Sequence, residues 1–464
     1  MSNVASLKST GGQGDWPPSW NVGEHSIAVG RYIDPEFAKL EYQKLWSKVW
    51  QSAARLDEIP EPGDFTTYDI GDQSVLVVRV DAATVKAYHN VCPHRGTALS
   101  IGCGRFANGK IICPFHGWRW DLTGRNEFVL ERQEFRGGKL QAGDVALREV
   151  KVEIWAGFVF INFDKNPQPF ADFIAPVRQM VEDLAIGDMH HYWWKSLKVR
   201  ANWKVAQEAF FEAYHVPATH PQLDKAGREV IFEGRADAPF GHRNVAYEAY
   251  PRGHGRFFGG RKTPMAGYVQ EGETGDPVED MINRISHLVY EMDAMVLQED
   301  VDIAKLLRGT KVPEGSSLGA EYVKLLYQHA ALQQRPMPAP KPETLGMWGG
   351  EVCIFPNLMI LPNAGNAMFY RVRPDGSDPD GCIFEIYSTK TYPAKDKLPR
   401  AVVQHKTDGT DPAQFLLIPR QDMSNIPRMQ KGLHSQGIRH IWLASENEKL
   451  ILNMHQELDR YLQA

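Results

Sequence analysis

Two short stretches, NVCPHRGTALS (residues 90–100) and KIICPFHGWRW (residues 110–120), decide the fold of the first part of the chain. Each contains one cysteine and one histidine, first as C-x-H and then as C-x-x-H, with 18 residues between the two motifs. The four candidate ligands are Cys92, His94, Cys113 and His116. Both motifs follow runs with strand-like patterning. The spacing therefore predicts two loops of a small β-domain that meet at one metal site.

Two kinds of metal site fit these four ligands. Structural zinc also takes two cysteines and two histidines, but its usual spacing puts both cysteines in one knuckle and both histidines on a helix. Here each loop supplies one thiolate and one imidazole, which suits a Rieske [2Fe–2S] cluster. Gly96 and Gly117 would let the backbone turn tightly beside it. We favour the cluster and keep zinc as the alternative.

The bulk composition is that of a two-domain globular protein. The 464 residues exceed the length at which one core usually keeps growing. The net charge of −5, without a long basic run, gives no indication of nucleic-acid binding. No apolar stretch is long enough to cross a membrane, and the N-terminus lacks the apolar run of a signal peptide. We therefore expect a cytoplasmic protein with no membrane or nucleic-acid partner.

The five cysteines argue for a reducing compartment rather than a disulfide framework, because they are few and odd in number. Cys103 lies between the two motifs without a partner histidine, and Cys353 and Cys382 lie in apolar runs. We expect these three to be structural thiols.

Hydrophobic periodicity divides the chain into three segments. Residues 1–45 are expected to form an arm and a helix that packs on the second domain, with helical spacing over 34–54. Alternating runs predict an all-β domain over 46–163, and 164–464 mixes helices with strands. The helices of this last part are expected at 171–186, 202–214, 279–308, 318–334 and 446–462, and its strands at 351–361, 366–374 and 382–393. This pattern predicts an α+β fold.

A second candidate site lies in ANWKVAQEAFFEAYHVPATH, residues 201–220. Helical periodicity reaches Tyr214 and Pro217 ends it, so His215 and His220 could converge on one ion. Two histidines five positions apart are weak evidence among the 16 of the chain, and an amphipathic helix with incidental histidines is the alternative. A one-electron cluster needs an acceptor, however, and two histidines with a carboxylate form a non-haem iron site.

From about residue 40 to its end the chain resembles the oxygenase (α) subunits of Rieske non-haem iron oxygenases, the ring-hydroxylating family. CPHRG (92–96) and CPFHGW (113–118) match its cluster loops, and NWKVAQEAFFEAYHVPATH (202–220) matches its iron motif. The resemblance implies a third iron ligand late in the chain, and Asp422 in LIPRQDMSNIPRMQKGLHSQG fits. The alternative for Asp422 is the N-cap of a helix. The implied catalytic domain packs helices on an antiparallel sheet, the helix-grip (START-like) arrangement.

The resemblance also assigns a role to Glu212, where the family usually has aspartate. Glu212 would bond His215 of its own subunit and His116 of the next, and so connect the two metal centres across a subunit boundary. A solvated position on a helix face is the alternative. Asn202 and Glu208 match family positions and are further candidate catalytic residues, with a purely structural role as the alternative.

The implied function is that of a terminal oxygenase. Electrons from NAD(P)H would arrive through a separate reductase, with or without a ferredoxin, because the chain has no flavin or nicotinamide motif. The cluster would pass them to mononuclear iron, where O2 oxidises an organic substrate. A head-to-tail homotrimer, with or without a β subunit, would bring the cluster of one chain beside the iron of the next.

The substrate is expected to be apolar, aromatic or polycyclic, and either one or two oxygen atoms could enter it. The segments that would form the pocket, 230–310 and 350–370, are aromatic and aliphatic with few charges. A quaternary amine or betaine-like molecule is the alternative, since a bridging glutamate also occurs in quaternary-amine oxygenases of the family. A zinc-stabilised binding protein and a Rieske electron carrier without a second iron are the other readings.

Overall fold

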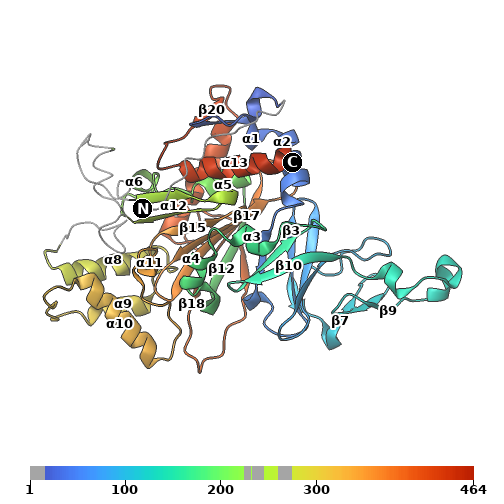
Figure 1. Cartoon of the computed structure of the whole chain (residues 1–464), viewed down its shortest axis with the longest axis horizontal. Coiled ribbons are helices and arrows are strands. Elements are labelled where there is room, and N and C mark those ends of the chain that lie inside the picture. Colours follow the sequence, from blue (N-terminus) through green and yellow to red (C-terminus); the bar gives the residue numbers. More distant parts are fainter. Residues whose placement is uncertain (1–15, 224–230, 232–244, 260–273) are drawn as a thin grey trace.

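The computed structural model describes residues 16–223, 231, 245–259 and 274–464. Figure 1 shows a smaller β-rich part that ends in β7 and β9, and a larger part built on a second sheet and covered by helices. The α+β class with a small β-domain and a larger catalytic domain is confirmed. None of the helices in the described ranges combines the length and hydropathy needed to cross a bilayer.

The N-terminal segment packs on the larger part. Its first strand pairs with a strand near the C-terminus, and Asp34 caps the following helix by accepting from the backbone N–H of Glu36. The predicted helix over 34–54 is too long, because the chain passes into a sheet strand at residue 51. The elements are β1 (Ser26–Ala28), α1 (Gly30–Ile33), α2 (Pro35–Glu41), a π-helical turn (Tyr42–Trp46) and β20 (His440–Trp442).

The smaller part contains a seven-stranded sheet in the order β2-β11-β10-β5-β4-β3-β6 and a three-stranded sheet in the order β7-β8-β9. Both cluster cysteines belong to a core that includes Tyr88, Trp118 and Trp120. The strands are β2 (Gln51–Arg55), β3 (Asp64–Ile70), β4 (Gln73–Arg79), β5 (Val85–His89), β6 (Cys103–Arg105), β7 (Lys110–Ile112), β8 (Arg119–Asp121), β9 (Asn126–Phe128), β10 (Glu149–Trp155) and β11 (Phe158–Asn162).

The larger part is built on an eight-stranded sheet in the order β13-β14-β15-β16-β17-β18-β12-β19, in which only the pairing of β12 with β19 is parallel. Its long central strands are almost wholly buried, as expected for a sheet covered on both faces. The strands are β12 (His190–Val199), β13 (Val245–Ala249), β14 (Gly255–Gly259), β15 (Glu351–Ile354), β16 (Leu358–Pro362), β17 (Asn366–Pro374), β18 (Cys382–Lys390) and β19 (Val403–Lys406).

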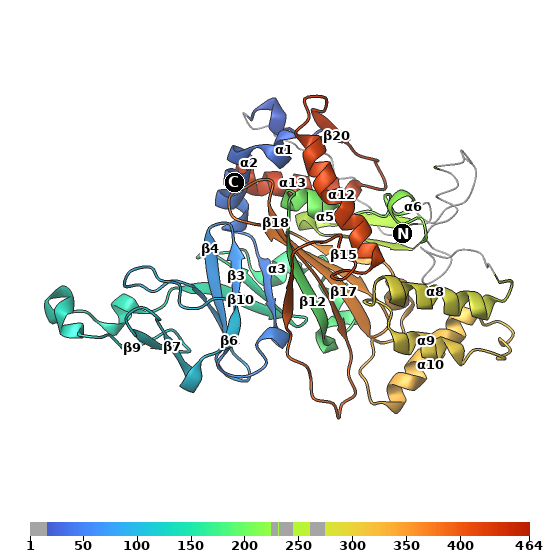
Figure 2. The same cartoon turned by 180° about the vertical axis from the view of Figure 1, so that it is seen from behind.

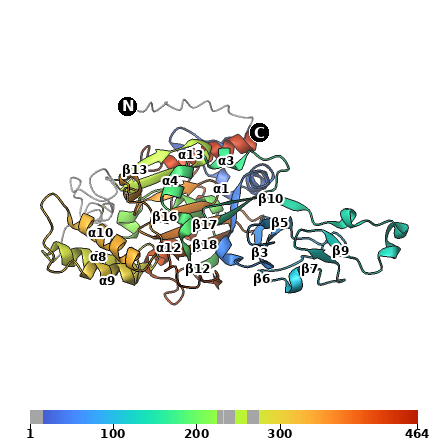
Figure 3. The ribbon, with the colours of Figure 1, turned by 60° about the horizontal axis from the view of Figure 1, so that its bottom comes forward.

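The helices of the larger part lie in two groups. Figures 1 and 2 show α5, α12 and α13 above the sheet and α8, α9 and α10 together at the end away from the smaller part. Figure 3 shows α8, α9 and α10 at the end opposite to β7 and β9 from another direction. The helices are α3 (Phe170–Ile174), α4 (Arg178–Asp183), α5 (Trp203–Glu208), α6 (Val216–Thr219), α8 (Pro277–Glu291), α9 (Gln298–Lys305), α10 (Leu318–Leu332), α11 (Pro342–Leu345), α12 (Leu417–Leu433) and α13 (Lys449–Gln463).

Three of the helices predicted for the larger part differ from the structure. The helix expected over 202–214 ends at Glu208, and the one expected over 279–308 is two helices, α8 and α9. The stretch 171–186 likewise contains two short helices instead of one. In each case buried apolar side chains continue past the break, so their spacing alone could not reveal it.

Candidate functional site

The two cluster loops are built in the same way. The backbone N–H of Gly96 donates to the carbonyl of Cys92, and that of Gly117 donates to the carbonyl of Cys113, both at 3.0 Å. Both glycines have left-handed backbone angles, with φ of 81° and 68°, which explains the residue type. Each loop therefore turns back on itself directly after its cysteine.

The four predicted cluster residues come together with free donor atoms. The Nδ1 atoms of His94 and His116 are buried and have no hydrogen-bond partner among the described residues, and the two ring centroids lie 4.7 Å apart. Burial, together with the neighbouring Cys113 thiol, raises the pKa of Cys92 to about 11 in the absence of a metal. Two buried thiols and two unpaired imidazole nitrogens are the donors that a Rieske cluster requires. The residues present fit this group.

Trp118 shields one side of this site. Its ring stacks on His94 with the ring centroids 4.6 Å apart, and it is buried in the core of the smaller part. Phe115, next to His116, is 56% exposed. The cluster site therefore lies at the surface of the chain, behind an apolar rim.

The second predicted site also comes together. His215 and His220 lie at the two ends of the short helix α6, and Asp422 lies on α12. The Oδ1 atom of Asp422 is 2.9 Å from Nε2 of His220 and 3.7 Å from Nε2 of His215. Potential ligand atoms of all three residues lie within 4.8 Å of one another. Two imidazoles and one carboxylate on one side of an ion leave positions open, as in non-haem iron oxygenases.

Each of these imidazoles is held from behind. Nδ1 of His215 is 2.7 Å from Oε1 of Glu212, and Nδ1 of His220 is 2.8 Å from Oε1 of Gln421. Since both partners are hydrogen-bond acceptors, each Nδ1 carries a proton, and each Nε2 is the ring nitrogen that could bind an ion together with Asp422. This arrangement fits a divalent iron ion. Gln421 was not among the predicted residues, and its position directly before Asp422 is the signal that could have found it.

The site is electrostatically suited to a cation. Burial lowers the pKa of His215, but the carboxylates of Glu212 and Asp422 outweigh this effect and raise the pKa to about 9. Glu212 is buried, so its carboxylate is not the solvated helix-face group of the alternative interpretation. Its bond to His215 is present within one chain. The bond to His116 of a neighbouring subunit stays a prediction.

Asn202 and Glu208 lie in a different environment. Asn202 is buried and caps α5 by accepting from the backbone N–H of Lys204. Glu208 bonds the hydroxyl of Tyr32 and Nε2 of His455. Neither lines the cavity described below, and these contacts favour the structural interpretation over a catalytic one.

Asp422 is not the N-cap of a helix, which was the alternative interpretation of this residue. It lies in the second turn of α12, a 17-residue helix that begins at Leu417, and is therefore not the N-cap of a helix starting after it. Pro419 is compatible with this position, because the first turn of a helix needs no N–H from its residues. The helix aims the Asp422 side chain at His220.

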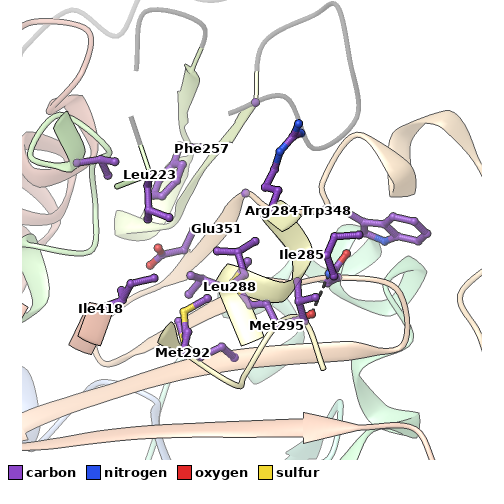
Figure 4. A pocket seen from close by; sticks show the side chains of 18 of the residues that line it. Leu223, Phe257, Arg284, Ile285, Leu288, Met292, Met295, Trp348, Glu351 and Ile418 are labelled. Carbon is purple, nitrogen blue, oxygen red and sulfur yellow. Dashed lines mark hydrogen bonds between the residues drawn. The ribbon is translucent and has the colours of Figure 1, made fainter. Parts of the chain in front are cut away.

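A cavity of 570 Å³ opens beside these three residues. Figure 4 shows part of its lining, to which β14, β15, β16, β17, α6, α8, α10, α11 and the start of α12 contribute. Most of the lining is apolar, including Phe257, Ile285, Leu288, Met292, Leu361 and Met368. Both predicted pocket segments contribute, although 232–244 and 260–273 lie outside the described residues. Residues 317–323, at the start of α10, were not predicted to contribute.

Comparison with known protein families gives two matches. A model of the Rieske [2Fe-2S] domain matches residues 49–134. A model of the ring hydroxylating alpha subunit catalytic domain matches residues 186–306 and 313–464. The expected cluster and mononuclear iron are thereby confirmed as the cofactors of the matched domains. The exact predicted domain boundaries stay predictions.

Curated relatives match over part of the chain. The glycine betaine monooxygenase oxygenase subunit of Pseudomonas aeruginosa is 32% identical over 205 residues, which are 44% of this chain and 47% of the relative. The carnitine monooxygenase oxygenase subunit of Escherichia coli K12 is 29% identical over 42% of this chain and 52% of the relative. Choline monooxygenase of Spinacia oleracea is 27% identical over 49% of this chain and 55% of the relative. The chain thus spans about half the length of these relatives.

Solved structures match over nearly the whole chain. A quaternary ammonium Rieske monooxygenase in complex with L-carnitine has a TM-score of 0.61 at 16% identity, covering 94% of this chain and 95% of the other. Naphthalene 1,2-dioxygenase from Rhodococcus sp., bound to indole, has a TM-score of 0.60 at 16% identity, covering 94% of both chains. At 16% identity, these two matches show a shared fold and nothing further.

Proposed function

This chain belongs to the ring-hydroxylating family of Rieske oxygenase α subunits, and from that premise we propose that it is a terminal oxygenase that oxidises a quaternary amine. The observation that carries the activity is the convergence of His215, His220 and Asp422 at the edge of an apolar cavity. The substrate class follows the names of the relatives, which act on glycine betaine, carnitine and choline.

The atoms and electrons of the proposed reaction balance when a reductant outside the chain supplies two electrons. One O2, two electrons and two protons convert an N-methyl group into an N-hydroxymethyl group and water. The hydroxymethyl group then leaves as formaldehyde and a proton, and the tertiary amine remains. Iron held by His215, His220 and Asp422 would supply the activation of O2. A separate reductase is the proposed electron source.

The residues of the chain contribute orientation and exclusion of water. Glu212 and Gln421 hold the two imidazoles with Nε2 facing inward, which fixes the geometry of the open positions. The apolar wall of α8 keeps bulk water from the substrate, so oxidising chemistry is confined to the bound molecule. The Cys92–His94 and Cys113–His116 loops supply the second metal centre.

The earlier expectation of an aromatic or polycyclic substrate becomes the second candidate. The apolar lining of the cavity favours it, while the names of the curated relatives favour the amine. A role in aromatic hydrocarbon catabolism finds no support among those relatives. A substrate that combines a cationic head with an apolar body would satisfy both observations.

The test is a substrate screen on the iron-loaded enzyme with NADH and a surrogate reductase. Glycine betaine, carnitine, choline and naphthalene would be compared by O2 uptake, product mass and formaldehyde release. We expect amine-dependent O2 uptake matched by formaldehyde, and none from the His215→Ala variant. Oxidation of naphthalene without oxidation of any amine would overturn the substrate class, and product formation by His215→Ala would overturn the site.

A further inference from the structure

Glu351, the first residue of β15, carries a carboxylate inside the apolar cavity. Its exposed fraction is 2%, and its Oε1 atom has no hydrogen-bond partner among the described residues. Figure 4 shows the carboxylate pointing to the side of the cavity where Leu223 and Ile418 lie. Leu223 follows His220 and Ile418 lies one turn before Asp422, so this is the iron side. A buried carboxylate oxygen without a hydrogen-bond partner is costly, and its position in a cavity indicates a missing partner.

Within the described lining of the cavity, no positive side chain provides that partner. Arg284 is the sole lysine or arginine among the described residues that line the cavity, and its side chain points away from Glu351 in Figure 4. Burial raises the pKa of Glu351 well above its ordinary value, and the nearby charge of Glu212 raises it further. A cation bound beside Glu351 would therefore stabilise its negative form, and no lysine or arginine of the described cavity lining supplies one there.

An aromatic ring lies beside this carboxylate. Phe257 on β14 is the direct cross-strand partner of Glu351 in an antiparallel pairing. Side chains at such positions project from the same face of the sheet as close neighbours. Both residues line the cavity, so a cation there would meet a carboxylate and the face or edge of a ring. Rings next to a carboxylate suit a quaternary ammonium group, which can donate no N–H hydrogen bond.

The cavity is larger than such a head group needs. Its volume of 570 Å³ falls in the range of about 300 to 1,000 Å³ that holds drug-sized ligands. The wall beyond Glu351 is apolar, with Ile285, Leu288 and Met292 from α8 and the residue that follows it. A ligand with a cationic head at Glu351 would place an apolar body along this wall.

We propose that Glu351 binds the positively charged nitrogen of an amphiphilic amine whose apolar body packs along α8. The assignment rests on the proposed function and deepens it, because it names the residue that selects for charge and the kind of body the substrate carries. It also sets an orientation. The cationic head points toward His215, His220 and Asp422, so the carbons bonded to nitrogen lie nearest the iron.

Equilibrium dialysis on the metal-loaded enzyme tests the selection for charge. The probes are benzyltrimethylammonium and neopentylbenzene, a neutral molecule of the same shape in which carbon replaces nitrogen. We expect the cation to bind at least about 30-fold more tightly, as for other buried charge pairs. Glu351→Gln should abolish this preference, whereas Glu343→Gln, which removes a carboxylate from an exposed site on α11, should leave it unchanged.

Absence of a preference in the unaltered enzyme, or an unchanged preference in Glu351→Gln, would overturn the assignment. The pair of probes on the unaltered enzyme decides the matter even if the variant misfolds. Tetramethylammonium tests the apolar body: it should bind at least about tenfold more weakly than benzyltrimethylammonium, and equal affinity would refute the role of the α8 wall. These binding results are separate from turnover, so a failure here leaves the proposed oxygenase activity standing on its own test.

Discussion

Glu212 accepts two hydrogen bonds from the same residue, one from the backbone N–H of His215 and one from its Nδ1. A single carboxylate thereby sets both the position and the tautomer of the imidazole. Glutamate reaches this geometry within one turn of chain, so the extra methylene relative to aspartate does not prevent the contact. A residue that orients a metal-binding side chain in this way affects metal binding and activity nearly as strongly as the metal-binding residue itself.

Glu212→Gln should therefore weaken the site without removing it. The amide keeps one acceptor oxygen but loses the charge, and the rate of electron transfer from cluster to iron should fall by about tenfold or more. Rapid-mixing spectroscopy of cluster reoxidation and metal analysis would measure rate and iron content together. Glu343→Gln is the control for loss of one negative charge. An unchanged rate with full iron content would remove Glu212 from the electron-transfer path.

Motifs could predict the candidate metal ligands, because ligand chemistry restricts their identity and spacing. Cys92, His94, Cys113 and His116 were all found in this way, and the structure brings them together. Gln421 was not predicted, although its position next to Asp422 was a signal, and Glu351 could not be found from its immediate sequence. A glutamine has no characteristic spacing, and a glutamate at the start of an apolar strand reveals its role only when the sheet places it in a cavity.

At the scale of elements, Asn202 shows how one side chain starts a helix that positions the site. It caps α5 and also donates to the backbone carbonyls of Tyr32 and Pro379. Asn202→Ala should lower the free energy of unfolding by about 1 to 3 kcal/mol, since it removes the cap and the two hydrogen bonds to the carbonyls of Tyr32 and Pro379. Chemical denaturation would measure this change.

Turnover distinguishes the two roles considered for Asn202. If the residue is structural, the turnover rate per iron-loaded enzyme at low temperature should stay within about twofold of that of the unaltered enzyme. Loss of a contact made in the transition state would lower the rate far more than twofold. A rate that collapses while the fold and the iron content persist would restore the catalytic interpretation.

The buried carboxyl group of Glu208 should make the stability of the protein depend on pH. Burial raises its pKa from the ordinary 4.5 to about 8, so the folded state holds this proton more tightly than the unfolded state. Its contribution to stability is complete below pH 4.5 and is lost as the pH rises through about 8. The ionisable groups around it are Tyr32, Arg31, Lys204, Glu448 and His455.

Thermal unfolding between about pH 5 and pH 9 would show this contribution. The Tm of the unaltered protein should fall as the pH rises through this range, and the fall should be shallower in Glu208→Gln, which cannot ionise. Parallel curves for the two proteins would contradict the assignment. Glu343→Gln, whose carboxylate is exposed, should follow the unaltered protein.

The elements were predicted well where periodicity is regular and less well near the iron site. The strands over 366–374 and 382–393 and the helix over 318–334 correspond closely to β17, β18 and α10. α12 was not predicted, because Pro419 and Pro427 interrupt its pattern. α5 ends six residues early because Phe210 and Phe211 are buried outside a helix, so apolar spacing continues where helical geometry does not.

At the scale of the whole molecule, the two candidate metal sites lie far apart along the long axis of the molecule. Figures 1 and 2 place α6 in the larger part and β7, which leads into the Cys113 loop, near the opposite end. The cluster rim exposes Val91, Ile112 and Phe115. Exposed apolar side chains around a redox centre favour docking to another protein surface. We propose that the surface that docks on the cluster rim belongs to a second copy of the chain, and that the copies form a homotrimer.

A mixing experiment tests this arrangement. Subunits with His116→Ala lack a complete cluster site, and subunits with His215→Ala lack a complete iron site. Each variant alone should be inactive, but coexpressed subunits should regain activity, because an intact cluster can then lie beside an intact iron site. Recovery of about a tenth or more of the unaltered rate is expected if mixed trimers form statistically.

Absence of recovery, with mixed oligomers verified by mass, would contradict electron transfer between subunits. A chain that is monomeric by analytical ultracentrifugation would contradict it as well. The sequence could predict two domains and two metals from length and motifs. It could not reveal their separation, which depends on how the two sheets are joined.

The most direct measurement of the central claim is a single turnover of chemically reduced enzyme with O2 and a quaternary amine, without reductase. The account predicts that the visible spectrum reports cluster oxidation while formaldehyde and the tertiary amine form at up to one product per mononuclear iron. Asp422→Ala should keep the cluster spectrum, lose mononuclear iron and yield no product. Retention of that iron, or product at the unaltered yield, would contradict the account.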